Sequence, residues 1–153
     1  MTSITSITSI RIRRETDEDP DLSYLGKYAS HAPSAGAYVD RERHGDRTRG
    51  TYRYFVPTNT DDPKSALADY RRMEDYNNGG WCMTGVFAEA ELNINGTRQT
   101  VRSPGIWSVE SDSDASYFDE IGRNEIAELT VVLTELGCSK RAVKRAAARY
   151  IKG

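Results

Sequence analysis

The segment that decides the fold is WCMTGVFAEAELNINGTRQTV, which spans residues 81–101. Apolar side chains occupy every second position in its middle, at Val86, Ala88, Ala90, Leu92 and Ile94. Glu89, Glu91 and Asn93 fall between them, so the pattern predicts a strand with one apolar face and one polar face. Asn95-Gly96 is the preferred two-residue turn of a β-hairpin, and residues 97–101 are therefore predicted to return antiparallel.

Two further strands and three helices are predicted around this hairpin. TYRYFVP (51–57) and IWSVE (106–110) have the β-branched and aromatic residues that are typical of strands. Apolar residues recur at helical spacing within residues 61–78, 113–136 and 139–152. The pattern predicts an α+β fold, in which an antiparallel β-meander of three or four strands is packed on one face by two or three helices.

The first 50 residues show no sustained period. The chain begins with a Thr-Ser-Ile repeat, which fits either a strand or a frayed start, and residues 20–50 are rich in Gly, Ala, Ser and Arg. We expect residues 1–50 to form an N-terminal extension that is largely loop. Residues 51–153 are expected to form a single α+β domain that includes a basic C-terminal helix, 139–152.

Composition argues against several classes of protein. No apolar run approaches the roughly 20 residues of a membrane span, and the N-terminus lacks the apolar stretch of a secretory signal. Cys82 and Cys138 are too few for a disulfide framework. We therefore expect a cytoplasmic protein with reduced thiols and no membrane partner. The sequence does not predict the oligomeric state.

Charge is unevenly distributed along the chain, although the formal net charge is only −2. Residues 60–138 carry 15 acidic and six basic side chains, whereas residues 139–153 carry six basic side chains and no acidic one. An acidic body with a basic tail indicates charged binding partners.

The stretch GIWSVESDSD (105–114) places Glu110, Asp112 and Asp114 at alternate positions after a predicted strand. It does not match a calcium-binding EF-hand loop, because Ala115 and Ile121 occupy the positions of the required Gly and Glu. The simplest interpretation is a helix N-cap, in which the acids also favour the positive end of the helix dipole. A Mg²⁺ or Mn²⁺ site and an outward-facing decoy for phosphate groups are the alternatives.

Four other residues have both a functional and a purely structural interpretation. Trp107 is either a core residue or an exposed aromatic anchor beside the acids. Glu89 and Glu91 lie about 7 Å apart on one strand face, which suits paired catalytic carboxylates but also any polar sheet face. Cys82 fits a core thiol better than a nucleophile paired with a histidine. No glycine-rich phosphate loop occurs. We predict no cofactor, no metal site and no enzymatic activity.

The predicted C-terminal helix carries a row of basic side chains: Lys140, Arg141, Lys144, Arg145 and Arg149. Such a row is typical of a surface that contacts phosphate groups. It is equally compatible with docking against the acidic body and with a solvated helix face.

Four stretches together resemble a family of small uncharacterised proteins carried by phages, plasmids and integrated mobile elements. They are YRRMEDYNNGGWC, AEAEL with the following NG and QT, GIWSVESDSD with the following SY, and EIAELTVVLTELG. The resemblance covers about Asp69 to Gly137 and is most specific from Trp107 to Asp114. It brings no catalytic residue, but it implies a mobile-element context, in which genes of this size often encode inhibitors of host defence such as anti-CRISPR proteins.

The resulting hypothesis is a non-enzymatic binding protein from a phage or mobile element that acts against host defence. An acidic surface would occupy a nucleic-acid-binding groove of a host protein or ribonucleoprotein complex. Its expected residues are Glu110, Asp112, Asp114, Glu89, Glu91 and Trp107. The alternative is a nucleic-acid-binding accessory protein that uses the basic C-terminal helix.

Overall fold

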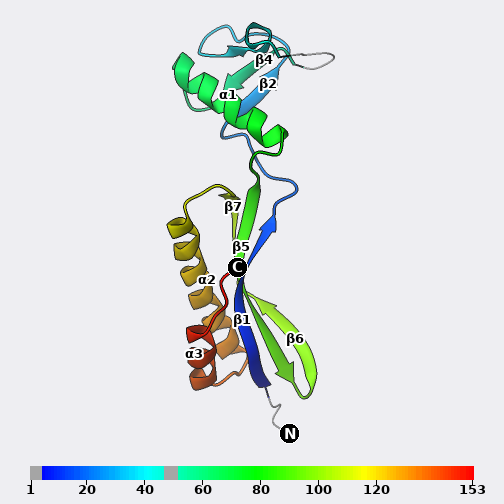
Figure 1. Ribbon diagram of the computed structural model, residues 1–153, viewed down its shortest axis with the longest axis vertical. Coiled ribbons are helices and arrows are strands. Elements are labelled where there is room, and N and C mark those ends of the chain that lie inside the picture. Colours follow the sequence, from blue (N-terminus) through cyan, green and yellow to red (C-terminus); the bar gives the residue numbers. More distant parts are fainter. Residues whose placement is uncertain (1–4, 47–51) are drawn as a thin grey trace. The chain divides into compact units, whose positions relative to one another are not determined.

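The computed structural model describes residues 5–46 and 52–153 and divides the chain into two compact units. The main unit comprises residues 5–18 and 82–153, and the inserted unit is Asp19–Trp81 (Figure 1). The expected division after residue 50 is therefore wrong. The chain leaves the main unit after its first strand and returns at residue 82, so that segments far apart in sequence share one core.

The main unit contains four strands and two helices, which makes it α+β as predicted. Its elements are β1 (Thr5–Thr16), β5 (Met83–Ile94), β6 (Thr97–Arg102), β7 (Ile106–Glu110), α2 (Ala115–Glu135) and α3 (Lys140–Ala148). The long strand β5 pairs antiparallel with β1 along one edge and with β6 and β7 along the other.

The predicted hairpin is confirmed. Ile94 pairs with Thr97, and Glu89 pairs with Arg102. Asn95 and Gly96 both have positive φ, 52° and 85°, as a two-residue type I′ turn requires. The third strand differs from a simple meander, because β7 pairs with β5 and not with β6. The reason is length: β6 covers only half of β5, so the edge at Met83 to Val86 is open to β7.

Residues 5–16 form β1, so the expectation of a largely loop-like extension is wrong there; residues 1–4 lie outside the described part of the chain. Ile10 and Ile12 are buried, and Arg11 between them is exposed. This period of two is typical of a strand with one buried face. At its other edge β1 pairs with the tail, since the Ile12 N–H donates to the Ile151 carbonyl at 2.8 Å. The basic helix α3 consequently ends earlier than predicted.

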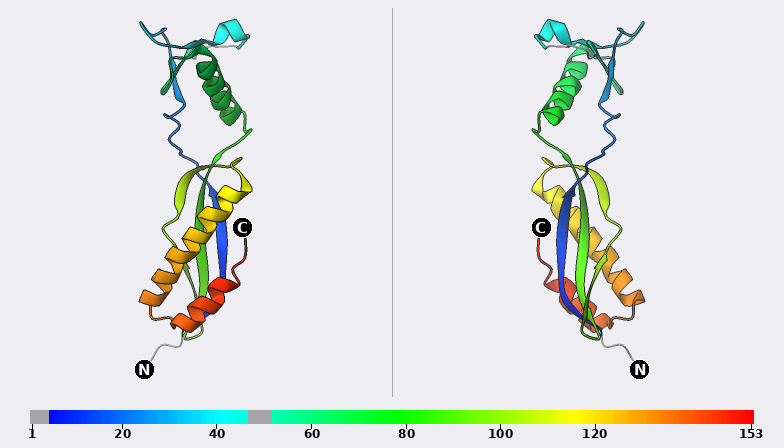
Figure 2. Two further views of the ribbon diagram at one scale, coloured as in Figure 1. Left: turned by 90° about the vertical axis from the view of Figure 1, so that its left-hand side faces the viewer. Right: turned by 90° about the vertical axis from the view of Figure 1, so that its right-hand side faces the viewer.

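Helices α2 and α3 lie together on one face of the sheet (Figure 2). Their apolar stripes meet the inward side chains of β1 and β5 in a core whose most buried members are Ile10, Val86, Leu92, Val109, Leu129 and Leu133. The alternation in β5 and the helical period in α2 therefore build one core, as predicted. No helix in the described residues has both the length and the apolar character that crossing a membrane requires.

The inserted unit is a second, smaller α+β unit. Its elements are β2 (Gly26–Ala29), β3 (Val39–Asp40), the 3₁₀ helix η1 (Arg41–His44), β4 (Tyr54–Pro57) and α1 (Pro63–Asn77). The strands form a sheet in the order β2-β4-β3, and α1 contacts β4 and β3. Asp62 caps α1 by accepting a hydrogen bond from Lys64 N–H, and Pro63 follows it in the first turn.

Candidate functional site

The turn between β7 and α2 is held by its serines. Ser111 exchanges two hydrogen bonds with the backbone of Cys82: its Oγ accepts from Cys82 N–H, and its own N–H donates to the Cys82 carbonyl. Ser113 donates from both N–H and Oγ to the Glu110 carbonyl, at 3.0 and 2.7 Å. These bonds fix the path of the chain from strand to helix.

The carboxylate of the N-cap residue does not cap α2. Asp114 occupies the N-cap position, but its side chain accepts no capping hydrogen bond. Asp112 and Asp114 are exposed, whereas Glu110 is half-buried. Glu110 and Asp112 also interact within the chain. The capping interpretation therefore accounts for the position of Asp114 but not for its outward-facing carboxylate.

The acidic character continues along the first half of α2. Residues 110–128 contain seven acidic side chains and a single basic one, Arg123. Glu120 and Glu128 are exposed, and neither has an ion-pair partner among the described residues, whereas Asp119 lies 3.8 Å from the Lys152 ammonium. We call Asp112, Asp114, Glu120 and Glu128 the acidic surface.

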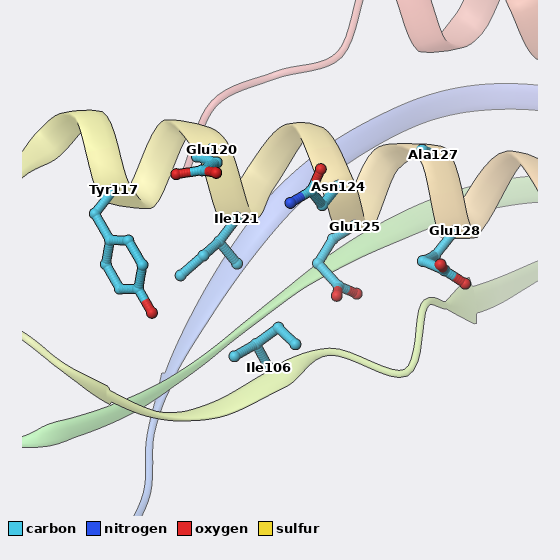
Figure 3. Close-up of a pocket in the computed structure, with 8 residues that line it drawn as sticks. All are labelled: Ile106, Tyr117, Glu120, Ile121, Asn124, Glu125, Ala127 and Glu128. Atoms are coloured by element: carbon cyan, nitrogen blue, oxygen red, sulfur yellow. The ribbon is translucent and has the colours of Figure 1, made fainter.

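A groove of about 540 Å³ lies beside these residues, between α2 and β7. Figure 3 shows Tyr117, Ile121 and Glu125 reaching from α2 toward the strand, and Ile106 reaching back from β7. Asn124, Ala127, Glu120 and Glu128 complete the lining. Ile106 and Tyr117 are nearly half exposed, so the walls of the groove are partly apolar and open to solvent.

Glu125 is a buried carboxylate at the bottom of this groove, with only 4% of its surface exposed. Its Oε2 accepts hydrogen bonds from Ser103 Oγ at 2.5 Å and from Gly105 N–H at 2.9 Å. Sequence analysis did not single out this residue. The signal was present, because Glu125 falls on the apolar row of α2 between Ile121 and Leu129, where a charge needs a specific partner.

Trp107 is an exposed aromatic residue, with 46% of its surface accessible, so it is not part of the core. Two residues, Trp107 and Ser108, oppose Gly85 at a break in the register between β5 and β7, and Ser108 adopts a positive φ of 64°. The indole ring lies on Gly85, where a Cβ atom would be only 2.3 Å from it. Because Gly85 has no Cβ atom, the indole ring of Trp107 can pack directly on the sheet.

The other two acids expected in the binding surface are used inside the sheet. Glu89 is buried and binds Arg102 at 2.8 Å and Arg13 at 3.5 Å, while Glu91 binds Arg98 at 2.8 Å. These are cross-strand pairs of opposite charge, which stabilise neighbouring strands. Glu89 and Glu91 therefore do not belong to the acidic surface.

The basic residues of α3 face solvent. Val143 is buried and Ala146 and Ala147 pack against the core, which turns the opposite side of the helix outward. Lys140, Arg141, Lys144, Arg145 and Arg149 are all exposed, and none of them has an ion-pair partner in the part of the chain that the structure describes. Docking of this row against the acidic body is therefore not observed.

A separate polar network lies in the inserted unit. Tyr28 donates to Glu74 at 2.6 Å, Tyr70 donates to Asp46, and the Arg41 guanidinium contacts both Tyr70 and Glu74. Burial, reinforced by the hydrogen bond to Asp46, raises the pKa of Tyr70 to about 12. Burial and the bond to Glu74 likewise raise the pKa of Tyr28. The network joins η1, β2 and α1.

This network predicts that the inserted unit loses stability in alkali. In the folded state both tyrosines keep their protons above pH 10, where tyrosines of the unfolded chain ionise. The folded state then binds more protons, so the free energy of unfolding falls as pH rises from about 10 toward the folded pKa. Urea unfolding of a Trp107→Phe variant, followed by Trp81 fluorescence at pH 7 and 10.5, measures this. Tyr28→Phe should reduce the difference, and an unchanged difference would contradict the assignment.

Comparisons with known proteins return no match: no protein-family model, no curated protein and no solved structure is similar to this chain. Among the described residues, no group of three or more His, Cys, Asp or Glu side chains is arranged to hold a metal ion.

Proposed function

We propose that this chain is a non-enzymatic binding protein that uses the acidic surface and the adjacent groove to occupy a positively charged site on a partner. In the mobile-element context that the sequence resemblance implies, the partner is a host protein or ribonucleoprotein complex, and the site is its nucleic-acid-binding groove. Binding then blocks host defence by competition with nucleic acid.

One observation carries the proposal: Asp114, Glu120 and Glu128 are exposed acids, and Asp114 stands at the N-cap of α2 without a side-chain capping bond. Ser111 and Ser113 make the structural hydrogen bonds, and Asp114 makes no side-chain cap bond. Glu120 and Glu128 extend the same charge along α2. The charges of Asp114, Glu120 and Glu128, which form no ion pair within the described residues, are available for recognition.

Electrostatics explains why such a surface suits a basic partner. Charges of one sign on a surface speed association with a complementary surface and discriminate against wrong partners. Trp107, Tyr117 and Ile106 are exposed near the acids along the chain, and aromatic side chains are the residues that most often dominate binding energy. The acidic charges then determine which partner binds, and the exposed apolar side chains contribute most of the binding energy.

Affinity capture from a lysate of the cell that carries the gene tests the proposal. The full chain should retain a complex that is released by competing DNA or RNA and by raised salt, because both compete for the same basic groove. A variant with Asp112 and Asp114 changed to Lys should not retain it. Equal capture of the partner by the original chain and the lysine variant would contradict the proposal. A complex that nucleic acid does not displace would also contradict it.

A second candidate function rests on α3. Its four exposed basic side chains and that of Arg149, which follows it, form no ion pair within the described residues, which favours contact with phosphate groups. This alternative predicts gel shifts with DNA or RNA that weaken steeply between 50 and 200 mM salt, as is typical of roughly five phosphate contacts. Changing Arg141, Arg145 and Arg149 to Gln should abolish them. No shift at either salt concentration would remove this candidate.

A further inference from the structure

Glu125 has binding capacity that the fold does not use. Both of its hydrogen bonds, from Ser103 and Gly105, go to Oε2. Every buried side-chain oxygen or nitrogen of the described residues has a hydrogen-bond partner. Since Oε1 has none, this atom is not sealed from solvent, and Glu125 is one of the residues that line the groove. A carboxylate fixed through one oxygen therefore presents the other to any ligand in the groove.

The surroundings of this oxygen match one kind of side chain. Tyr117 offers an exposed ring, Ile106 and Ile121 offer apolar walls, and Glu128 adds a second carboxylate at the rim (Figure 3). An arginine side chain has a long apolar stem, a planar guanidinium that stacks on aromatic rings, and several N–H donors for carboxylates. Lysine shares the charge but not the planar, multi-donor head.

We propose that the groove between β7 and α2 binds an arginine side chain of the partner, with Glu125 as the residue that recognises its guanidinium. The inference rests on the proposed function, since it names the partner group that the acidic surface attracts. Charge complementarity selects a cation, and the combination of ring, apolar walls and fixed carboxylate selects arginine among cations. Ser103 donates a hydrogen bond to Glu125 and accepts one from the Ala88 N–H of β5. The position of the Glu125 carboxylate is therefore fixed before the ligand binds.

Titration of the full chain with short peptides, followed by backbone amide NMR, tests the inference. The probes are acetyl-Gly-Arg-Gly-amide and its lysine and citrulline counterparts. The arginine peptide should shift the amides of Ile106, Tyr117 and Glu125 in a saturable way and bind several-fold more tightly than the lysine peptide. The uncharged citrulline peptide should not bind. Equal responses to arginine and lysine, spread over all exposed acids, would overturn the inference.

Glu125→Gln provides the variant, because a glutamine oxygen can accept the same two hydrogen bonds without the charge. This substitution should lower the affinity for the arginine peptide by about tenfold, as expected for a charged group that contacts the ligand directly. Glu135→Gln is the matched control: it removes one charge from the exposed end of the same helix and should leave binding unchanged. Equal loss in both variants would mean that only long-range charge matters and would overturn the arginine site.

A second variant tests the arginine site independently, in case Glu125→Gln does not fold. Tyr117→Ala removes the exposed ring without disturbing the buried hydrogen bonds of Glu125. It should lower the affinity for the arginine peptide more than the affinity for the lysine peptide. The two proposals fail separately. If changing Asp112 and Asp114 abolishes partner capture but Glu125→Gln and Tyr117→Ala do not weaken it, the arginine site is wrong and the acidic surface stands. If none of these changes affects capture, both are wrong.

Discussion

Replacing Asp112, Asp114 and Glu120 by lysine is expected to weaken binding of the captured partner by about 100-fold, which corresponds to about 2.7 kcal/mol. The three side chains are exposed at the start of α2, and Asp114, at the N-cap, makes no side-chain capping bond. The variant places positive charges against a positive surface, and like charges brought together in an interface cost several kcal/mol. Calorimetric titration of the purified partner at physiological salt measures the effect.

The matched control reverses three exposed acids elsewhere: Glu18, Asp75 and Glu135. It changes the net charge by the same amount but leaves the acidic surface intact. Its affinity should stay within about threefold of the original, because salt screens charges that lie outside the contact surface. Similar losses in both variants would mean that net charge, and not this surface, determines binding.

Changing Leu129 to Ala should cost the main unit about 2–5 kcal/mol of unfolding free energy. Leu129 is completely buried on α2 within the core that β1, β5 and the two helices share. The close packing of such cores allows only partial collapse around the missing methyl groups, so a cavity adds to the lost transfer energy. The acidic surface and the groove are carried by the same helix, and binding should weaken once the unit is partly unfolded.

Each unit contains one tryptophan, which allows the two to be followed separately. Trp107 reports the main unit when Trp81 of the inserted unit is changed to Phe. In that background urea unfolding should show a lower midpoint for Leu129→Ala with an unchanged slope. Val131→Ala, at an exposed position of the same helix, is the control and should change stability by less than about 0.5 kcal/mol. Equal midpoints for the two variants would contradict the placement of Leu129 in the core.

The elements that could be predicted are those in which a local pattern and the tertiary contacts agree. The β5–β6 hairpin follows from alternation and from Asn95-Gly96, and α2 follows from its apolar stripe. The strand β1 was left open in the Thr-Ser-Ile repeat and missed in residues 11–16, although Ile10 and Ile12 alternate with arginines, because its partner lies at least 68 residues away in sequence. The inserted unit was also missed, because the main unit is built from two segments that are far apart in sequence. No local sequence pattern marks where the first of these segments ends or where the second begins.

The candidate site was predicted only in part. Alternating acids after a strand predicted charge at the β7–α2 turn, where Asp112 and Asp114 are exposed, and Ser111 and Ser113 make hydrogen bonds that hold this turn. Glu89 and Glu91 were assigned to the same surface because a polar strand face looks solvated until its neighbours are known. The arginines that bind them come from β1 and β6, and such cross-strand partners depend on register.

Competition between this protein and nucleic acid for the purified partner tests the central claim most directly. Fluorescence anisotropy of a labelled oligonucleotide bound to the partner should fall to its free value as the protein is added. The Asp112, Asp114 and Glu120 lysine variant should require about 100-fold more protein for the same release. A ternary complex, in which the partner holds oligonucleotide and protein together with undiminished anisotropy, would contradict occupation of the nucleic-acid groove by the acidic surface.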